Sequence, residues 1–223
     1  MKRFRIVQSI AAFVLMVVTC QGAQAVELKR QGTSVEDIVP AGWLHQESQG
    51  DLNKDGIADL VVIATPDYEE NLKRRDDGYV YNFNQPILAI YFGNAQGLFS
   101  QWRQYDNVIP ADDNEYCSHD IALTVTERGT LRIAVGMWCS AGSYGTSTDT
   151  YIYRYQKGDF YLIGKDTEEM MRNTGEINIV SENYLTWKRQ VTTSNAFDDK
   201  APATEKWSRL PKKALEKLGA REL

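Results

Sequence analysis

The residues best placed to do chemistry lie in a polar loop, 51–59, that reads D-L-N-K-D-G-I-A-D. Calcium prefers six to eight hard oxygen ligands, and a curled loop can aim alternate side chains at one centre. Gly56 allows the backbone conformation that such a curl needs. The spacing therefore predicts a calcium site, with a metal-free Asp- and Gly-rich turn as the alternative. Its ligands would be Asp51, Asn53, Asp55, Asp59 and the backbone carbonyl of Ile57.

The loop differs from an EF-hand, because Val62 stands where the twelfth-position Glu would be and the flanks at 43–49 and 60–64 are strand-like. The pattern D-x-N-x-D-G-x-x-D-L before a strand resembles the calcium loop of FG-GAP repeats, which integrin α-subunits and many secreted bacterial proteins carry. The resemblance implies a structural calcium ion between two strands. It covers one copy of the motif, and the chain is too short for a seven-bladed propeller.

Longer stretches are similar to a group of uncharacterised secreted or lipid-anchored bacterial proteins. That similarity implies export and a shared fold, and it implies no activity. The stretches that carry it are G-W-L-H-Q-E-S-Q-G-D-L-N-K-D-G-I-A-D-L-V-V-I, P-I-L-A-I-Y-F-G, Y-Q-K-G-D-F-Y-L-I-G and S-E-N-Y-L-T-W.

The N-terminus has the three parts of a secretion signal: basic residues at 2, 3 and 5, an apolar run at 10–18 and a small-x-small site at 23–25. The apolar run is short for a bilayer span, so we expect residues 1–25 to be removed and 26–223 to form one β-rich domain. The expected location is the periplasm, with secretion as an alternative. An uncleaved anchor, or an outer-membrane lipoprotein attached through Cys20, are further alternatives.

The net charge of the chain limits the classes of partner that it is expected to bind. Removing the signal would change the formal net charge from −5 to −8, and no Lys/Arg-rich run remains. Such a chain is not expected to bind nucleic acid, which requires a basic surface. The expected partner is instead a protein or a glycan of the cell envelope, and no membrane span is expected after cleavage.

Two cysteines remain after the signal, Cys117 and Cys139. An even pair in an oxidising compartment predicts a disulfide, whose loop closure would stabilise the fold by about 3 kcal/mol. The alternative is a reactive thiol served by His119.

Residues 138–149 (WCSAGSYGTSTD) are small, polar and aromatic, which is typical of a binding loop or of a flexible hairpin end. Ser143 and Tyr144 are its candidate contact residues. Small residues around a tyrosine, as at 140–147, also occur in periplasmic lysozyme inhibitors. Ser143 lies in G-S-Y-G, which is not the nucleophile elbow G-x-S-x-G.

Acidic residues surround Cys117 and His119 and could support metal binding or acid–base chemistry in a hydrolase. A solvated acidic loop is the alternative, and Cys/His pairs with zinc spacing are absent from the sequence. The cluster comprises Asp112, Asp113, Glu115, His119 and Asp120.

Alternating apolar residues predict a mainly β fold of antiparallel hairpins, arranged as two sheets or as a partial, propeller-like sheet in a single domain. A one-turn helix at 33–38, an exposed loop at 66–85 and a short C-terminal helix at 211–218 complete the prediction. The predicted strands are 58–64, 86–92, 97–105, 120–126, 130–138, 149–156, 159–163, 176–180 and 183–191, with hairpin turns at 127–129, 157–158 and 181–182.

Three functions follow from these features. The first is an exported, calcium-stabilised and non-catalytic binding protein of the cell envelope. The second is a periplasmic inhibitor or immunity protein that blocks a lytic or toxic enzyme with the loop at 138–149. The third is a hydrolase that uses the acidic cluster near His119.

Overall fold

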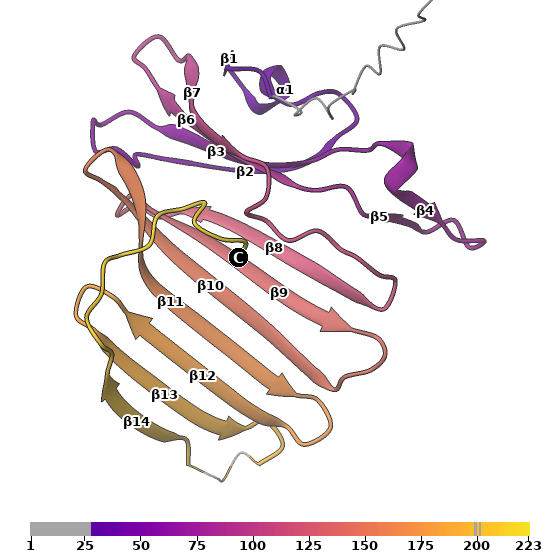
Figure 1. The fold of residues 1–223 in the computed structure, drawn as a ribbon, viewed down its shortest axis with the longest axis vertical. Helices are drawn as coiled ribbons and strands as arrows, with labels where there is room; N and C mark the ends of the chain where they lie inside the picture. The colour runs from indigo at the N-terminus through magenta and orange to yellow at the C-terminus, as the bar shows by residue number, and fades with distance from the viewer. Residues whose placement is uncertain (1–27, 199, 201) are drawn as a thin grey trace, which may run out of the picture.

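The computed structural model describes residues 28–198, 200 and 202–223, so the predicted signal and Cys20 lie outside the described part (Figure 1). Two antiparallel sheets pack against each other around a shared core, and a small hairpin projects beside them. None of the helices in the described part of the chain has the length and apolar composition of a membrane span. The five-stranded first sheet has the order β1 (Gln31–Gly32), β7 (Phe99–Tyr105), β6 (Ile87–Gly93), β3 (Asp59–Thr65) and β2 (Leu44–Gly50).

The second sheet is a seven-stranded meander in which every strand pairs with its neighbour in sequence. The predicted antiparallel, two-sheet β fold is therefore confirmed. The strands are β8 (Cys117–Val125), β9 (Thr130–Cys139), β10 (Gly145–Gln156), β11 (Asp159–Met171), β12 (Glu176–Asn183), β13 (Lys188–Asn195) and β14 (Thr204–Arg209).

The central strands β3 and β6 of the first sheet are buried on both faces, which explains why they are almost continuously apolar. Successive side chains of a strand point to opposite faces. On β3, Val61 and Ile63 face the core shared with the second sheet, while Leu60 and Val62 pack under the N-terminal segment. That segment contains α1 (Val35–Ile38), the predicted one-turn helix, which begins after Ser34.

Buried and more exposed side chains alternate along strands of the second sheet, as the sequence predicts. Leu131 and Ile133 of β9 and Tyr153 of β10 are buried against the first sheet. Burial declines toward the far edge, and all six residues of β14 are exposed. The sheet therefore reaches well past the core that the two sheets share.

The structure corrects the predicted position of one hairpin turn and the predicted loop at 66–85. The turn placed at 181–182 lies at 184–187, because the side chain of Asn183 accepts hydrogen bonds from the backbone of Leu185 and Thr186 and so closes the turn there. The exposed loop at 66–85 contains a short 3-10 helix, η1 (Glu69–Asn71), and the hairpin of β4 (Leu72–Arg74) and β5 (Val80–Asn82).

The short C-terminal helix predicted at 211–218 is not formed, and this segment is extended. Its backbone pairs with the start of β11: Leu162 N–H donates to Glu216, and Leu218 N–H donates to Phe160. The Leu218 side chain is buried in the main core. A helix of two turns is marginal on its own, so this pairing and burial decide the conformation.

An ion-pair cluster joins the first sheet, the second sheet and the C-terminal segment. The carboxylate of Asp159, buried at the start of β11, lies 3.4 Å from Arg103 on β7 and 2.9 Å from Lys217. Burial opposes its ionisation. The hydrogen bonds from Lys217 and the Phe160 backbone, with the charge of Arg103, outweigh burial and hold the pKa of Asp159 below its ordinary value.

We expect Asp159→Asn to lower the free energy of unfolding by about 1–2 kcal/mol at neutral pH, since the remaining charges can be solvated. A carboxyl with a lowered folded-state pKa stabilises above its unfolded pKa of about 4 and loses that contribution as the pH falls through the folded value. Urea denaturation at pH 7 and pH 3 should therefore show the two chains converging in acid. Asp76→Asn, which changes an exposed carboxylate, is the control, and a gap between native and variant chains that is as large at pH 3 as at pH 7 would contradict the assignment.

Candidate functional site

The loop between β2 and β3 is curled by its own polar side chains. Asp51 accepts hydrogen bonds from the backbone N–H of Lys54 (2.7 Å) and of Gly56 (3.1 Å). The Asn53 side chain accepts a hydrogen bond from Asp55 N–H, and the Asp55 side chain accepts one from Ile57 N–H. Lys54 and Gly56 have φ values of 69° and 86°, which such a tight curl requires. Each predicted ligand side chain on this loop is thus fixed in place.

Asp59 occupies a different position from the other candidate ligands, because its side chain is fully buried. It accepts hydrogen bonds from the N–H groups of Leu52 (2.9 Å), Asn53 (3.2 Å) and Gly93 (3.0 Å). Burial raises the pKa of this carboxyl in spite of those three bonds. Asp59 therefore ties the loop from inside to the end of β6.

The donor chemistry of the loop fits a hard cation, although its acidic side chains are spread out. Among the described residues no group of three or more His, Cys, Asp or Glu side chains is close enough to hold a metal. Three side chains and one carbonyl of the loop supply oxygen atoms, which are the ligands calcium prefers. Asp59 uses three of its roughly four acceptor positions on backbone N–H groups. The predicted calcium site at Asp51, Asn53, Asp55, Ile57 and Asp59 stays a prediction.

The loop also packs against the turn that joins β8 and β9. Gly50 lies so close to Val125 that a Cβ there would meet the valine side chain at 2.6 Å. A Cβ on Gly129 would likewise meet the carbonyl oxygen of Asp51 at 2.3 Å. The hydroxyl of Ser48 accepts a hydrogen bond from Val125 N–H at 2.8 Å. The conformation of the loop is therefore coupled to the contact between the two sheets.

The predicted disulfide is confirmed. Cys117 and Cys139 are register partners at the ends of β8 and β9, and their sulfurs are bonded. The alternative of a reactive thiol served by His119 is therefore wrong in this structure. The bond lies directly before the segment 140–144, which connects β9 to β10.

This connecting segment, 140–144, is held by a side chain that the sequence reasoning missed. Arg172, just after β11, donates hydrogen bonds to the carbonyls of Cys139 (2.8 Å), Ser143 (2.9 Å) and Tyr144 (3.2 Å). Its guanidinium also lies over the ring of Trp138, at 5.2 Å. We call residues 140–144 the braced tip. Arg172 is 28 residues from Tyr144, so only the pairing of β10 with β11 brings them together.

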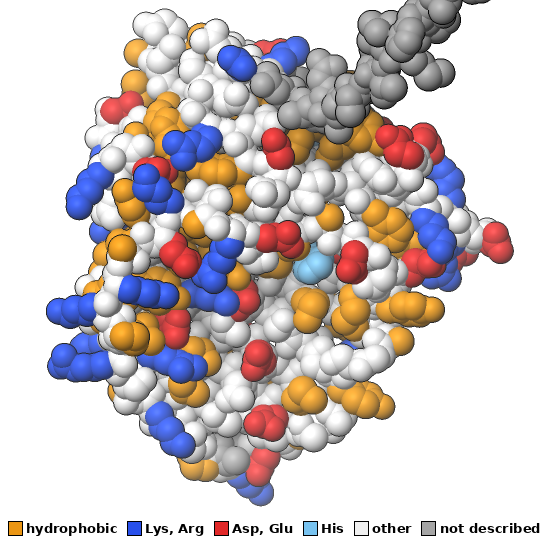
Figure 2. All heavy atoms as spheres, viewed as in Figure 1, with side chains coloured by type: hydrophobic (Ala, Val, Ile, Leu, Met, Phe, Trp, Pro, Cys, Tyr) orange, Lys and Arg blue, Asp and Glu red, His pale blue; other side chains and the backbone are white. Residues whose placement is uncertain are grey.

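Exposed aromatic side chains extend from the braced tip toward the β4–β5 hairpin, where Figure 2 shows hydrophobic side chains along this edge of the molecule. A hollow of about 300 Å³ lies among several of them. Large exposed apolar groups gathered in one place are typical of an interaction surface. The exposed fractions are 58% for Tyr79, 64% for Tyr116, 47% for Trp138 and 64% for Tyr144.

The acidic cluster near His119 is divided by the fold. The ring of His119 lies 3.0 Å from the carboxylate of Asp112, which also accepts the His119 backbone N–H. Glu115 instead forms an ion pair with Lys73, and Asp113 accepts from its neighbour Asn114. His119, Asp112 and Asp120 line a groove of about 480 Å³. The structure thus brings together His119 and Asp112 but not the whole predicted cluster.

One comparison with known protein families gives a match, and this match includes the 51–59 loop. Residues 46–83 match the FG-GAP repeat, a unit that suggests a β-propeller-like binding module. The match begins in β2 and ends just after β5, with the loop inside it. Strands β2, β3, β6 and β7 form a four-stranded antiparallel meander, as a propeller blade does. No curated protein and no solved structure matches the chain.

Proposed function

We propose that this chain is a calcium-stabilised, non-catalytic binding protein of the cell envelope, which contacts its partner through the braced tip. The observation that carries the proposal is an exposed tyrosine on a segment fixed by a disulfide and by Arg172. The FG-GAP match supports a binding module. The basic and apolar N-terminal segment supports export.

The tip has the properties of a binding hot spot. Tyrosine and tryptophan contribute much of the free energy at protein interfaces, because they bury large areas with few rotatable bonds. Tyr144 and Trp138 expose such area, and the three carbonyls bound by Arg172 fix the backbone between them. Fixing the backbone before binding reduces the entropy that association costs.

Calcium has a structural part in this proposal. The ion would be held by Asp51, Asn53 and Asp55 with the carbonyl of Ile57, and Asp59 would support the loop from inside. The positive charge would stabilise carboxylates that otherwise repel one another. Because the loop packs on the β8–β9 turn, the ion would strengthen the contact between the two sheets.

The proposal is tested by capture from an envelope extract, with calcium and with EGTA. The native chain should retain a protein or glycan that is lost when residues 140–144 are replaced by a Gly-Ser linker of equal length. The captured molecule should then bind the purified chain in a direct titration. A partner retained equally by both chains would contradict the role of the tip.

A second candidate is an inhibitor or immunity protein that inserts the tip into the cleft of a lytic or toxic enzyme. A rigid projection with an exposed tyrosine is the shape that such a cleft accepts, and this observation favours the candidate. The similarity of the small residues at 140–147 to periplasmic lysozyme inhibitors also supports it. The expected observation is loss of inhibition, with unchanged stability, when the tip is altered.

A further inference from the structure

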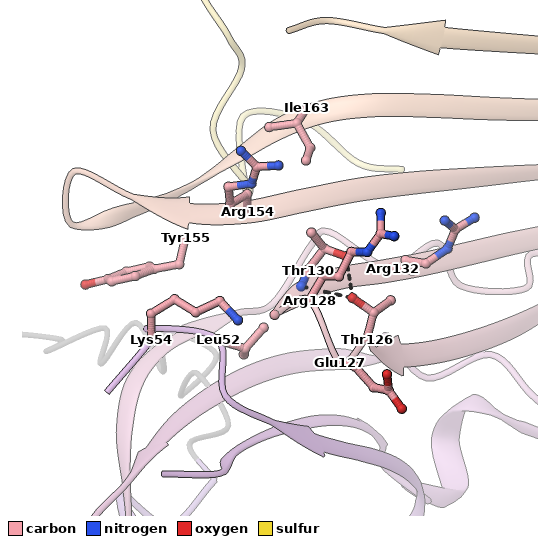
Figure 3. Close-up of a pocket in the computed structure, with 11 residues that line it drawn as sticks. Leu52, Lys54, Thr126, Glu127, Arg128, Thr130, Arg132, Arg154, Tyr155 and Ile163 are labelled. Carbon is pink, nitrogen blue, oxygen red and sulfur yellow. Dashed lines mark hydrogen bonds between the residues drawn. The ribbon is translucent and has the colours of Figure 1, made fainter. Parts of the chain in front are cut away.

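A basic hollow lies beside the β8–β9 turn, at the opposite end of β8 from the acidic loop 112–115. Its volume is about 770 Å³, and it is lined by the first half of the β2–β3 loop, the β8–β9 turn and the facing ends of β10 and β11 (Figure 3). Four cationic side chains line it: Lys54, Arg128, Arg132 and Arg154. On a chain with a formal net charge of −5, this local concentration of positive charge is unusual.

Most of this charge is not neutralised by the protein. Among the described residues no ion pair joins Lys54, Arg128 or Arg154 to a carboxylate, and Arg132 has one long contact of 3.5 Å with Asp166. Glu127 is the single acidic side chain of the lining, and its carboxylate points away from the arginine side chains in Figure 3. Holding like charges together is unfavourable unless an anion lies between them.

The hollow also offers apolar surface beside the charges. Leu52, Tyr155 and Ile163 form part of its wall, and Lys54 reaches across Gly129, where a Cβ would meet its ammonium group at 2.4 Å. The positive φ of Gly129, 67°, also favours glycine. This arrangement suits a ligand with a concentrated negative charge and a small organic body.

We propose that this hollow binds a phosphomonoester. Guanidinium groups pair with phosphate oxygens through two parallel hydrogen bonds. A phosphomonoester carries nearly two negative charges at neutral pH and three terminal oxygens, which suits three arginines better than a single carboxylate would. The site is separate from the braced tip, and it borders the 51–59 loop through Leu52 and Lys54.

The test is calorimetric titration of the purified chain at low ionic strength and constant calcium, with glucose 6-phosphate and with glucose. Glucose 6-phosphate should bind and glucose should not. Arg128→Gln and Arg154→Gln should each weaken binding by about tenfold or more, since each removes charged hydrogen bonds. Arg209→Gln, on the exposed strand β14, is the matched control and should bind as the native chain does.

A second arm distinguishes a soluble phosphomonoester from a lipid headgroup. The chain is floated with phosphatidic acid vesicles and, for comparison, with phosphatidylcholine vesicles. Flotation with phosphatidic acid that Arg154→Gln abolishes would identify a lipid headgroup as the ligand. Binding of glucose 6-phosphate without flotation would identify a soluble phosphomonoester. Binding to neither probe would overturn the proposal. It would also be overturned if Arg209→Gln weakened binding as much as Arg154→Gln, because the effect would then be one of diffuse charge.

Discussion

Asp59→Ala should lower the free energy of unfolding by about 3–5 kcal/mol, the largest effect we expect from one substitution in the loop. The side chain is fully buried and accepts three backbone N–H groups, from Leu52, Asn53 and Gly93. An unpaired buried donor costs about 1–3 kcal/mol, and the substitution leaves all three without this acceptor. Urea denaturation in EGTA measures the loss without any contribution from calcium.

Asp55→Ala is the matched control, because it removes an exposed carboxylate from the same loop. In EGTA it should cost less than about 1 kcal/mol, as surface substitutions usually do. Similar losses for the two variants would show that Asp59 does not support the loop in the way its hydrogen bonds indicate.

Tyr144→Ala should weaken binding to the partner by about 30-fold or more, which corresponds to the 2 kcal/mol or more typical of a hot-spot residue. The free energy of unfolding should change by no more than about 0.5 kcal/mol, because the side chain is 64% exposed. For the inhibitor candidate, the measurement is the inhibition constant against a panel of peptidoglycan-cleaving enzymes. For a captured partner, it is the dissociation constant.

The matched control is Trp207→Ala, which removes an equally exposed aromatic side chain from β14 on the far edge of the second sheet. It should leave binding unchanged. If Tyr144→Ala and Trp207→Ala have the same effect on binding, the contact surface lies elsewhere and the braced tip is not the binding element.

Most of the fold could be predicted because its strands show period-two burial or short apolar runs. The turns at 127–129 and 157–158 were predicted because each ends in a glycine, and the structure shows both glycines at positive φ. The strand β14 was missed because all its residues are exposed and lack alternation. The conformation of 211–218 depends on pairing with β11, a contact between segments far apart in sequence that local helix signals do not include.

The candidate site was predictable where it is local and not where it depends on packing. The spacing of the Asp51–Asp59 loop identified its position, and residues 46–83 match the FG-GAP repeat. The same spacing gave no sign that Asp59 would turn inward to bind backbone N–H groups. The support of the tip by Arg172 was missed because strand register, which the sequence does not specify, places it there. The basic hollow likewise combines side chains from four separate segments.

The proposal that calcium binds the 51–59 loop and stabilises the fold can be tested by the melting temperature of the purified chain in calcium and in EGTA. A ligand at 100 times its dissociation constant stabilises the folded state by about 2.7 kcal/mol. For a domain of this size that corresponds to a rise of about 5–10 °C. We expect this rise for the native chain and none for Asp55→Ala. Equal melting temperatures of the native chain in the two solutions would contradict the claim.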